Sequence, residues 1–232
     1  RVHPAECAEP APSERETIDW ACNAALDRLG FATSGELAAF WATVKPEEAK
    51  AWCAGALKRG EIVEIAIEGA NGTLRKCFAR PDARDAAAAV AQPQTRVRIL
   101  SPFDPALRDR GRAERLFGFF YRIEIFVPEP KRQYGYYVFP VMERDRIIGR
   151  IDARAIRAEG RLAVRAFWPE RGVAMGAGRL ARLETELQRL SRFAGCDDER
   201  HAPPVSGSAC HPASPRASGW RREGIPACPA AT

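Results

Sequence analysis

The 232-residue sequence lacks several features that would assign it to a well-known class of protein. No apolar run approaches the roughly 18 uncharged residues that a membrane-spanning helix needs. Residues 1–15 have no apolar core and do not resemble a secretory signal. The seven cysteines form no C-x-x-C pair. An odd number of cysteines without a disulfide framework indicates reduced thiols in a cytoplasmic protein.

Histidine is also scarce, with three residues in the whole sequence, and this limits the metal sites that could form. Cys196, His201, Cys210 and His211 could be combined into a site, but their spacing matches no zinc motif. We therefore expect no metal, no cofactor and no membrane contact. The first residue is arginine rather than methionine, and we interpret the chain as a fragment whose natural beginning lies upstream.

Positive charge is present in excess, with a net charge of +6, but it is distributed unevenly. Residues 1–95 hold 11 basic and 14 acidic side chains, whereas residues 96–195 hold 21 and 12. The remaining residues carry four of each sign. All basic residues of the middle segment except Lys131 are arginine, the side chain best suited to bidentate phosphate contacts. The middle segment is therefore expected to face a polyanion.

The order of elements in the first part of the chain predicts a winged-helix domain over residues 15–80, preceded by a linker or frayed end at 1–14. A capping box starts the second expected helix, Pro46 opens the third, and Gly60 follows its last residue. Two strands of alternating pattern follow around a glycine-containing turn. The helices and strands are expected over residues 17–29, 34–41, 46–59, 63–68 and 73–78.

Two interpretations of this domain stay open. The third helix of a winged helix usually contacts DNA, but here it contains no Asn, Gln, Ser or Thr side chain that could read base edges. Its first turn holds Glu47 and Glu48, which phosphate would repel. These features favour a scaffold or packing module over a base-reading one.

After a linker at 81–95 the pattern changes to short alternating strands. They are expected at residues 121–127, 134–142, 146–156 and 161–168, followed by an amphipathic helix at 176–194. We therefore expect a β-barrel-like DNA-binding domain with a terminal helix at 96–195, and a disordered tail at 196–232. The expected fold class is α+β: a winged helix-turn-helix, then a small antiparallel β-barrel-like domain and a C-terminal helix.

The first candidate DNA-binding cluster in this second domain is a set of closely spaced arginines: Arg108, Arg110, Arg112 and Arg115. Their spacing places several of them on one side of a helix or turn, where they could contact phosphates. Asp109 and Glu114 are interleaved with them. A solvated helix with internal salt bridges is therefore the alternative interpretation.

The second candidate cluster is a basic hairpin tip after two prolines, with Lys131 and Arg132 beside Tyr134 and Tyr136. Basic side chains next to exposed aromatic rings are typical of hairpins that grip a nucleic-acid backbone or wedge between bases. Ordinary packing of the tyrosines inside a barrel is the alternative. The expected DNA-binding residues are thus Arg108, Arg110, Arg112, Arg115, Lys131, Arg132, Tyr134 and Tyr136, with no catalytic residue among them.

The densest run of motifs lies between residues 100 and 152 and resembles one family. It includes Leu100-Ser101-Pro102-Phe103-Asp104, Arg112-Ala113-Glu114-Arg115-Leu116-Phe117-Gly118-Phe119, Tyr121-Arg122-Ile123-Glu124, Lys131-Arg132-Gln133-Tyr134-Gly135-Tyr136-Tyr137 and Gly149-Arg150-Ile151-Asp152. The chain resembles the winged-helix glycosylases that repair DNA interstrand crosslinks (YcaQ/AlkZ-like) over residues 17–195. Phe120 departs from the pattern, which has an acidic residue before the tyrosine.

The resemblance implies tandem winged helices and a β-barrel around duplex DNA, and hydrolysis of the N-glycosidic bond of bulky alkylated or crosslinked purines. It also implies a catalytic motif of glutamine, an aliphatic residue, and glutamine or aspartate in the first winged helix. Gln92-Pro93-Gln94 matches poorly, because its middle residue is proline and it lies in the linker. We therefore expect the catalytic motif to lie outside this chain.

The sequence thus predicts the C-terminal, double-stranded-DNA-binding part of a bacterial DNA repair glycosylase, acting as a monomer in the cytoplasm. A winged-helix transcriptional regulator without catalysis is the first alternative. A degenerate fragment without function is the second.

Overall fold

The computed structural model describes residues 11–196, and these fall into two compact units. The helical unit contains the described residues up to 92 together with Gly111–Phe119. The sheet unit contains residues 93–110 and the described residues from 120 onward. Most of the expected frayed end and all but the first residue of the expected tail lie outside the described residues. Among the described helices, none is long and apolar enough to cross a membrane.

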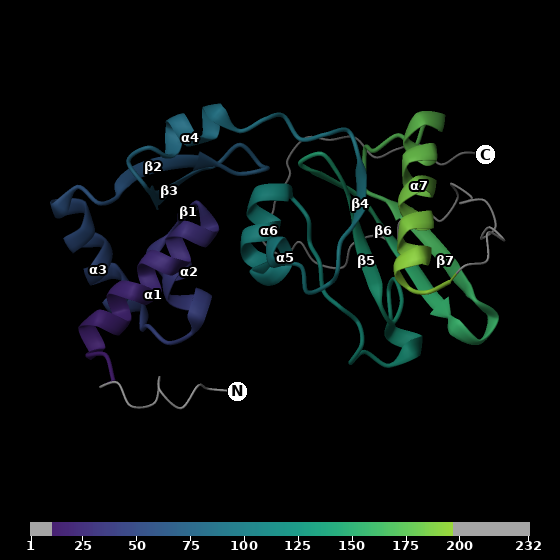
Figure 1. Ribbon diagram of the computed structural model, residues 1–232, viewed down its shortest axis with the longest axis horizontal. Helices are drawn as coiled ribbons and strands as arrows, with labels where there is room; N and C mark the ends of the chain where they lie inside the picture. The colour runs from purple at the N-terminus through teal and green to yellow at the C-terminus, as the bar shows by residue number, and fades with distance from the viewer. Residues whose placement is uncertain (1–10, 197–232) are drawn as a thin grey trace. The chain divides into compact units, whose positions relative to one another are not determined.

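The helical unit is built on three capped helices and a small antiparallel sheet (Figure 1). The predicted capping box of the second helix is confirmed, since the Thr33 side chain and the Glu36 side chain each accept the other residue's backbone N–H. The sheet order is β1-β3-β2. The elements are α1 (Glu14–Leu29), β1 (Phe31–Ala32), α2 (Ser34–Trp41), α3 (Pro46–Arg59), β2 (Val63–Glu68), β3 (Leu74–Ala79) and α4 (Ala83–Ala89).

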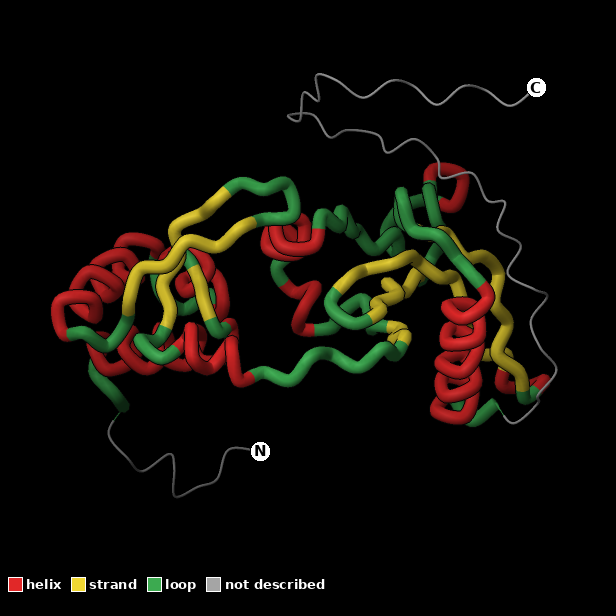
Figure 2. The backbone as a smooth tube through the Cα atoms, turned by 90° about the horizontal axis from the view of Figure 1, so that it is seen from above, coloured by secondary structure: helices red, strands yellow, loops and turns green. Residues whose placement is uncertain are grey.

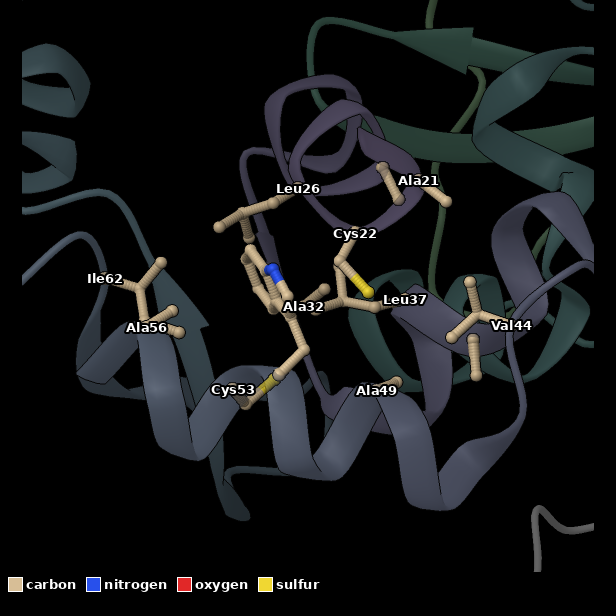
Figure 3. Close-up of a cluster of buried hydrophobic side chains, with 13 residues drawn as sticks. Ala21, Cys22, Leu26, Ala32, Leu37, Val44, Ala49, Cys53, Ala56 and Ile62 are labelled. Carbon is tan, nitrogen blue, oxygen red and sulfur yellow. The ribbon is translucent and has the colours of Figure 1, made fainter. Parts of the chain in front are cut away.

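A single apolar cluster holds the three helices of this unit together (Figure 3). Cys22 and Leu26 of α1, Leu37 of α2 and Cys53 of α3 are buried in it. Burial raises the pKa of the Cys53 thiol to about 12, so this side chain acts as an uncharged apolar group. Trp20 of α1 is different, because more than half of its surface is exposed.

The sheet unit is a curled, four-stranded antiparallel sheet in the order β4-β5-β6-β7, with α7 packed against it (Figure 1). Leu183 of α7 is buried among Val97, Val141 and Ile151 of three strands. Figure 2 shows α7 in red beside the strands of this sheet. The elements are β4 (Val97–Ile99), α5 (Pro105–Arg108), η2 (Glu129–Lys131), β5 (Val138–Glu143), β6 (Arg146–Ile156), η3 (Arg157–Glu159), β7 (Arg161–Pro169) and α7 (Ala177–Phe193).

Two irregularities in register bend this sheet, one of them next to Gly149. Val141 pairs with Gly149 but Met142 pairs with Ile147, so Ile148 is an extra residue on β6. A Cβ atom at Gly149 would lie 2.7 Å from the ring of Phe167. The glycine therefore allows the ring to pack directly on the strand backbone.

The fold is α+β, as predicted, with a curled antiparallel sheet and a C-terminal helix. The strand expected at 121–127 is wrong: these residues form a loop, and β5 begins only at Val138. Within the described residues β4 and β7 are the free edges of the sheet, so it is open rather than closed into a barrel. The helix or turn expected at the first arginine cluster consists of two helices, α5 and α6 (Arg110–Phe117), which are separated by the extended backbone of Asp109.

Candidate nucleic-acid interface

The four arginines of the first predicted cluster do not form one group within either unit. Arg108, at the end of α5, and Arg110, at the start of α6, are exposed residues of the sheet unit. Arg112 and Arg115 lie further along α6 in the part that belongs to the helical unit.

Arg112 and Arg115 both bind the carboxylate of Glu36 on α2. The Arg115 Nη2 atom lies 2.5 Å from Glu36 Oε1, and Arg112 Nη1 lies 3.4 Å from Oε2. The Glu36 side chain is only 8% exposed, and those of Arg112 and Arg115 are 11% and 16% exposed. The Arg112 guanidinium also lies over the ring of Phe31, 4.3 Å from its centroid. We call Glu36, Arg112 and Arg115 the buried ion cluster.

The carboxyl of Glu36 is held in its charged form by these neighbours. Burial raises its pKa, but the Thr33 backbone N–H and the guanidiniums of Arg115 and Arg112 lower it by more, and the net pKa lies below the ordinary value. The cluster fastens α6 to α2 and places the carbonyl of Arg115 2.8 Å from the backbone nitrogen of Ala70 in the β2–β3 turn. These contacts indicate that Arg112 and Arg115 have a structural role.

Many other arginines of the basic segment are also paired with carboxylates. Glu143 of β5 accepts hydrogen bonds from Arg179 and Arg182 of α7. Burial raises the pKa of Glu143, but these two arginines lower it to below the ordinary value. Between residues 96 and 195, carboxylate-paired arginines include Arg96, Arg112, Arg115, Arg150, Arg161, Arg179, Arg182 and Arg189. Much of the arginine surplus is therefore engaged within the protein.

Residues 120–137 of the sheet unit form a different surface, which we call the aromatic loop. It exposes three aromatic side chains, Phe120, Phe126 and Tyr136. The guanidinium of Arg122 lies 4.4 Å from the ring centroid of Phe120, and that of Arg132 lies 5.0 Å from the ring centroid of Tyr136. Cations stacked on exposed rings provide both a charge for phosphate and a flat face for a base.

The carboxylate of Glu124 organises this loop. It accepts hydrogen bonds from three successive backbone N–H groups, those of Gln133, Tyr134 and Gly135, at 2.8–3.1 Å. Three N–H groups that converge on one charged acceptor fix the course of the chain without a strand ladder. This interaction explains why the expected strand at 121–127 does not form.

The two predicted tyrosines of the loop have different surroundings. Tyr134 packs edge-on against Trp168, with ring centroids 5.4 Å apart, and the guanidinium of Arg150 lies 4.5 Å from its centroid. Burial raises the pKa of the Tyr134 hydroxyl. Tyr136 is 52% exposed, so its ring is available to a ligand. Tyr134 therefore supports the loop, whereas Tyr136 lines its surface.

Arg150 anchors the loop to the sheet. Its guanidinium donates to the carboxylate of Glu170 at 2.8 Å and to the backbone carbonyl of Phe120 at 2.9 Å, while it also covers Tyr134. The side chain is almost completely buried. One guanidinium thus holds both ends of the aromatic loop.

Lys131 and Arg132 are the basic side chains of the loop tip. Lys131 is exposed, and Arg132 donates to the carbonyl of Val127 at 2.9 Å. Neither forms an ion pair with a carboxylate among residues 11–196. Both charges therefore remain available to an anionic ligand.

Sequence reasoning missed four residues of this surface: Phe120, Arg122, Glu124 and Phe126. These residues alternate with Ile123 and Ile125 in the pattern of a strand. Because the segment was predicted to be a strand, these four residues were not predicted as part of a binding surface. The two prolines that follow, Pro128 and Pro130, were the available signal for a loop. Across the part of the chain that the structure describes, no cluster of three or more His, Cys, Asp or Glu side chains could hold a metal.

The chain was compared with models of known protein families and with solved structures. The model of the family described as DNA glycosylase AlkZ-like matches residues 1–193. No solved structure matches the chain. Because the match covers most of the chain, including both units, the protein belongs to the AlkZ-like DNA glycosylase family.

Proposed function

We propose that this chain binds double-stranded DNA through the aromatic loop and serves as the DNA-binding part of a glycosylase that removes bulky alkylated or crosslinked purines. Family membership supports DNA as the partner. The observation that carries the proposal is the composition of the loop tip, where cationic Lys131 and Arg132 stand beside the exposed ring of Tyr136. This combination suits a nucleic acid, whose phosphates and bases lie next to each other.

We further propose that the helical unit is a winged helix that acts mainly as a scaffold. Three helices followed by the β2–β3 hairpin support this assignment. The α3 helix has Glu47 and Glu48 in its first turn, and Glu48 caps the backbone N–H of Lys45. An acidic helix start suits the positive end of the helix dipole but not a phosphate backbone.

The proposal includes no base excision by this chain alone. The glutamine-based catalytic motif that the family resemblance implies does not occur in the 232 residues. Gln92 and Gln94, the nearest match, are exposed residues of the segment between α4 and β4. Release of an alkylated purine from damaged duplex by the purified chain would contradict this part of the proposal.

Salt-dependent binding tests the DNA interface. Fluorescence anisotropy of a labelled duplex would give the association constant at several salt concentrations, for the wild-type chain and for Lys131→Glu and Arg132→Gln. Each lost phosphate contact should weaken binding and reduce the slope of log K against log salt by about 0.9. A wild-type slope in both variants would exclude the loop tip from the interface.

A matched control separates local contacts from net charge. Arg157 lies in η3 and Arg192 lies on α7, and both are exposed residues of the sheet unit. Glutamate at each of these positions changes the net charge by as much as Lys131→Glu. The control variants should keep the wild-type slope, because they remove no contact with DNA in the proposed complex.

A further inference from the structure

Phe126 is the most exposed large apolar side chain of the described chain, with 91% of its surface accessible. It lies in the aromatic loop, in a turn closed by the Val127 N–H, which donates to the carbonyl of Glu124 at 3.0 Å. In the free protein the ring has almost no packing partner. Its exposure to water therefore costs free energy that no packing contact offsets.

The backbone on both sides of Phe126 is held in place. Glu124, two residues before it, binds the three N–H groups of residues 133–135. Val127, the residue after it, accepts the Arg132 Nε–H at 2.9 Å. The ring is therefore presented on a fixed turn rather than on a freely moving segment. A backbone that is already held in place loses less conformational entropy when the ring binds, which favours a role in recognition.

The neighbours of Phe126 indicate what it binds. Arg132 and Lys131 supply positive charge on one side of the turn, and Arg122 lies on the chain segment before it. The Glu124 carboxylate is occupied by backbone donors, which leaves Glu129 as the acidic side chain facing solvent in this loop. A protein partner would need an apolar patch of several hundred Å², whereas the two other exposed rings of this loop, Phe120 and Tyr136, each lie under a guanidinium.

We infer that Phe126 inserts between neighbouring bases of duplex DNA bound to the aromatic loop and opens that base step. This inference rests on the proposed function. Apolar side chains such as phenylalanine unstack base steps when they enter a groove, and flanking cations bind the phosphates on either side. The Phe126 ring supplies the wedge, and Lys131 and Arg132 supply the phosphate contacts.

A duplex that carries 2-aminopurine next to a central mismatch tests this role, since the fluorescence of the analogue rises when it loses stacking. The mismatch lowers the energy needed to open the step. Wild-type protein should raise the fluorescence, and Phe126→Ala should abolish the rise. The alanine variant should also bind about 5- to 150-fold more weakly, the range expected for loss of one stacked base. Its salt slope should stay unchanged, because phenylalanine carries no charge.

Phe193→Ala is the matched control, because Phe193 is 90% exposed and belongs to the same unit but lies at the end of α7. It should bind and unstack DNA like the wild type, and Phe126→Trp should retain both effects. Circular dichroism would verify that each variant is folded.

The outcomes distinguish this inference from the proposed function. If Phe126→Ala binds duplex and raises the fluorescence like the wild type, the wedge is excluded while DNA binding stands. If the wild-type chain binds no duplex at all, both fail. Binding of the wild type, but not Phe126→Ala, to anionic vesicles in the absence of DNA binding would assign the ring to a lipid surface instead.

Discussion

The buried ion cluster and the aromatic loop use the same side chain, arginine, in opposite ways. In the helical unit, Arg112 and Arg115 point at one buried carboxylate and fasten α6 to α2. In the sheet unit, Arg122 and Arg132 lie on the rings of Phe120 and Tyr136. The first arrangement pairs the charge with a buried carboxylate, and the second places it on an exposed aromatic ring. The local partner of each guanidinium, rather than the number of arginines, therefore indicates where an anionic ligand can bind.

Substitution of Glu36 should cause the largest change in the free energy of unfolding, and it should leave the DNA-binding surface unchanged. Glu36→Ala leaves two buried guanidiniums without their shared carboxylate and removes the side-chain acceptor of the Thr33 backbone N–H, so the free energy of unfolding should fall by about 3–5 kcal/mol. Chemical denaturation measures this change. The exposed pair of Arg59 and Glu61 provides the control, and Glu61→Gln should cause no measurable loss. Equal losses of unfolding free energy at Glu36 and Glu61 would contradict the idea that the buried ion pairs stabilise the fold more than the exposed pair.

Glu124 tests whether the aromatic loop is organised in advance. Glu124→Gln weakens a charged acceptor of three backbone N–H groups, at a cost of about 1.5–3 kcal/mol in the stability of the loop. Amide hydrogen exchange at residues 133–135 should accelerate, and DNA affinity should fall. Glu129→Gln, in the same loop, should leave exchange unchanged and bind DNA no more weakly than the wild type. Unchanged exchange in Glu124→Gln would show that the loop is held by other contacts.

Acid should weaken the buried ion cluster when the Glu36 carboxylate takes up a proton. The folded pKa of Glu36 is lowered, so its contribution to stability is present above the unfolded value near 4.5 and is lost as pH falls through the folded value. Urea unfolding at neutral pH and at acidic pH measures this loss. The decline in the free energy of unfolding should be smaller for Glu36→Gln than for the wild type, because glutamine does not titrate. Parallel declines would mean that Glu36 is not the titrating group.

Asp152 should have the opposite effect on the pH dependence of stability, because it favours the folded chain in acid. It is a nearly buried residue of β6, and burial raises its pKa although Arg165 lowers it. A raised folded pKa contributes stability at low pH that is lost as pH rises through that value. Asp152→Asn should therefore stabilise the chain at neutral pH relative to acid. A variant that is less stable at neutral pH would indicate that the charged carboxylate is needed.

The smallest expected effect concerns Tyr136, which should act on binding without acting on stability. Tyr136→Ala removes the ring that positions the Arg132 guanidinium through a cation–π contact of about 0.5–1 kcal/mol, and loss of that placement should weaken DNA binding by about two- to fivefold. Tyr136→Phe keeps the ring and should bind like the wild type. Tyr134→Ala provides the contrast, because that ring supports the sheet and its loss should lower the melting temperature.

Elements that depend on local sequence were predicted well. The capping box of α2 and the proline and glycine that bound α3 act within a few residues, so the sequence shows them directly. The bounds of β6 were also predicted, although its residues 147–153 are all buried and not only those of one face. The helix α7 was predicted from its amphipathic pattern, and Leu183 of its apolar face packs in the core.

Features that depend on distant partners were not predictable in this way. Arg115 meets Glu36, which lies 79 positions earlier, and no local spacing reveals that pairing. The loop at 120–137 owes its shape to Glu124, whose partners lie 9–11 residues away. Its alternating apolar residues nevertheless imitate a strand. The DNA-binding residues therefore remain a prediction, and we now restrict that prediction to the aromatic loop.

Hydrogen exchange of the whole chain with and without duplex DNA tests most directly whether the aromatic loop is the DNA-binding surface. We expect slower exchange at residues 120–137 in the complex, with no change at α2 or at Gly111–Phe119, where the buried ion cluster lies. Protection confined to α3 or to the ion cluster, with the aromatic loop unchanged, would contradict this assignment.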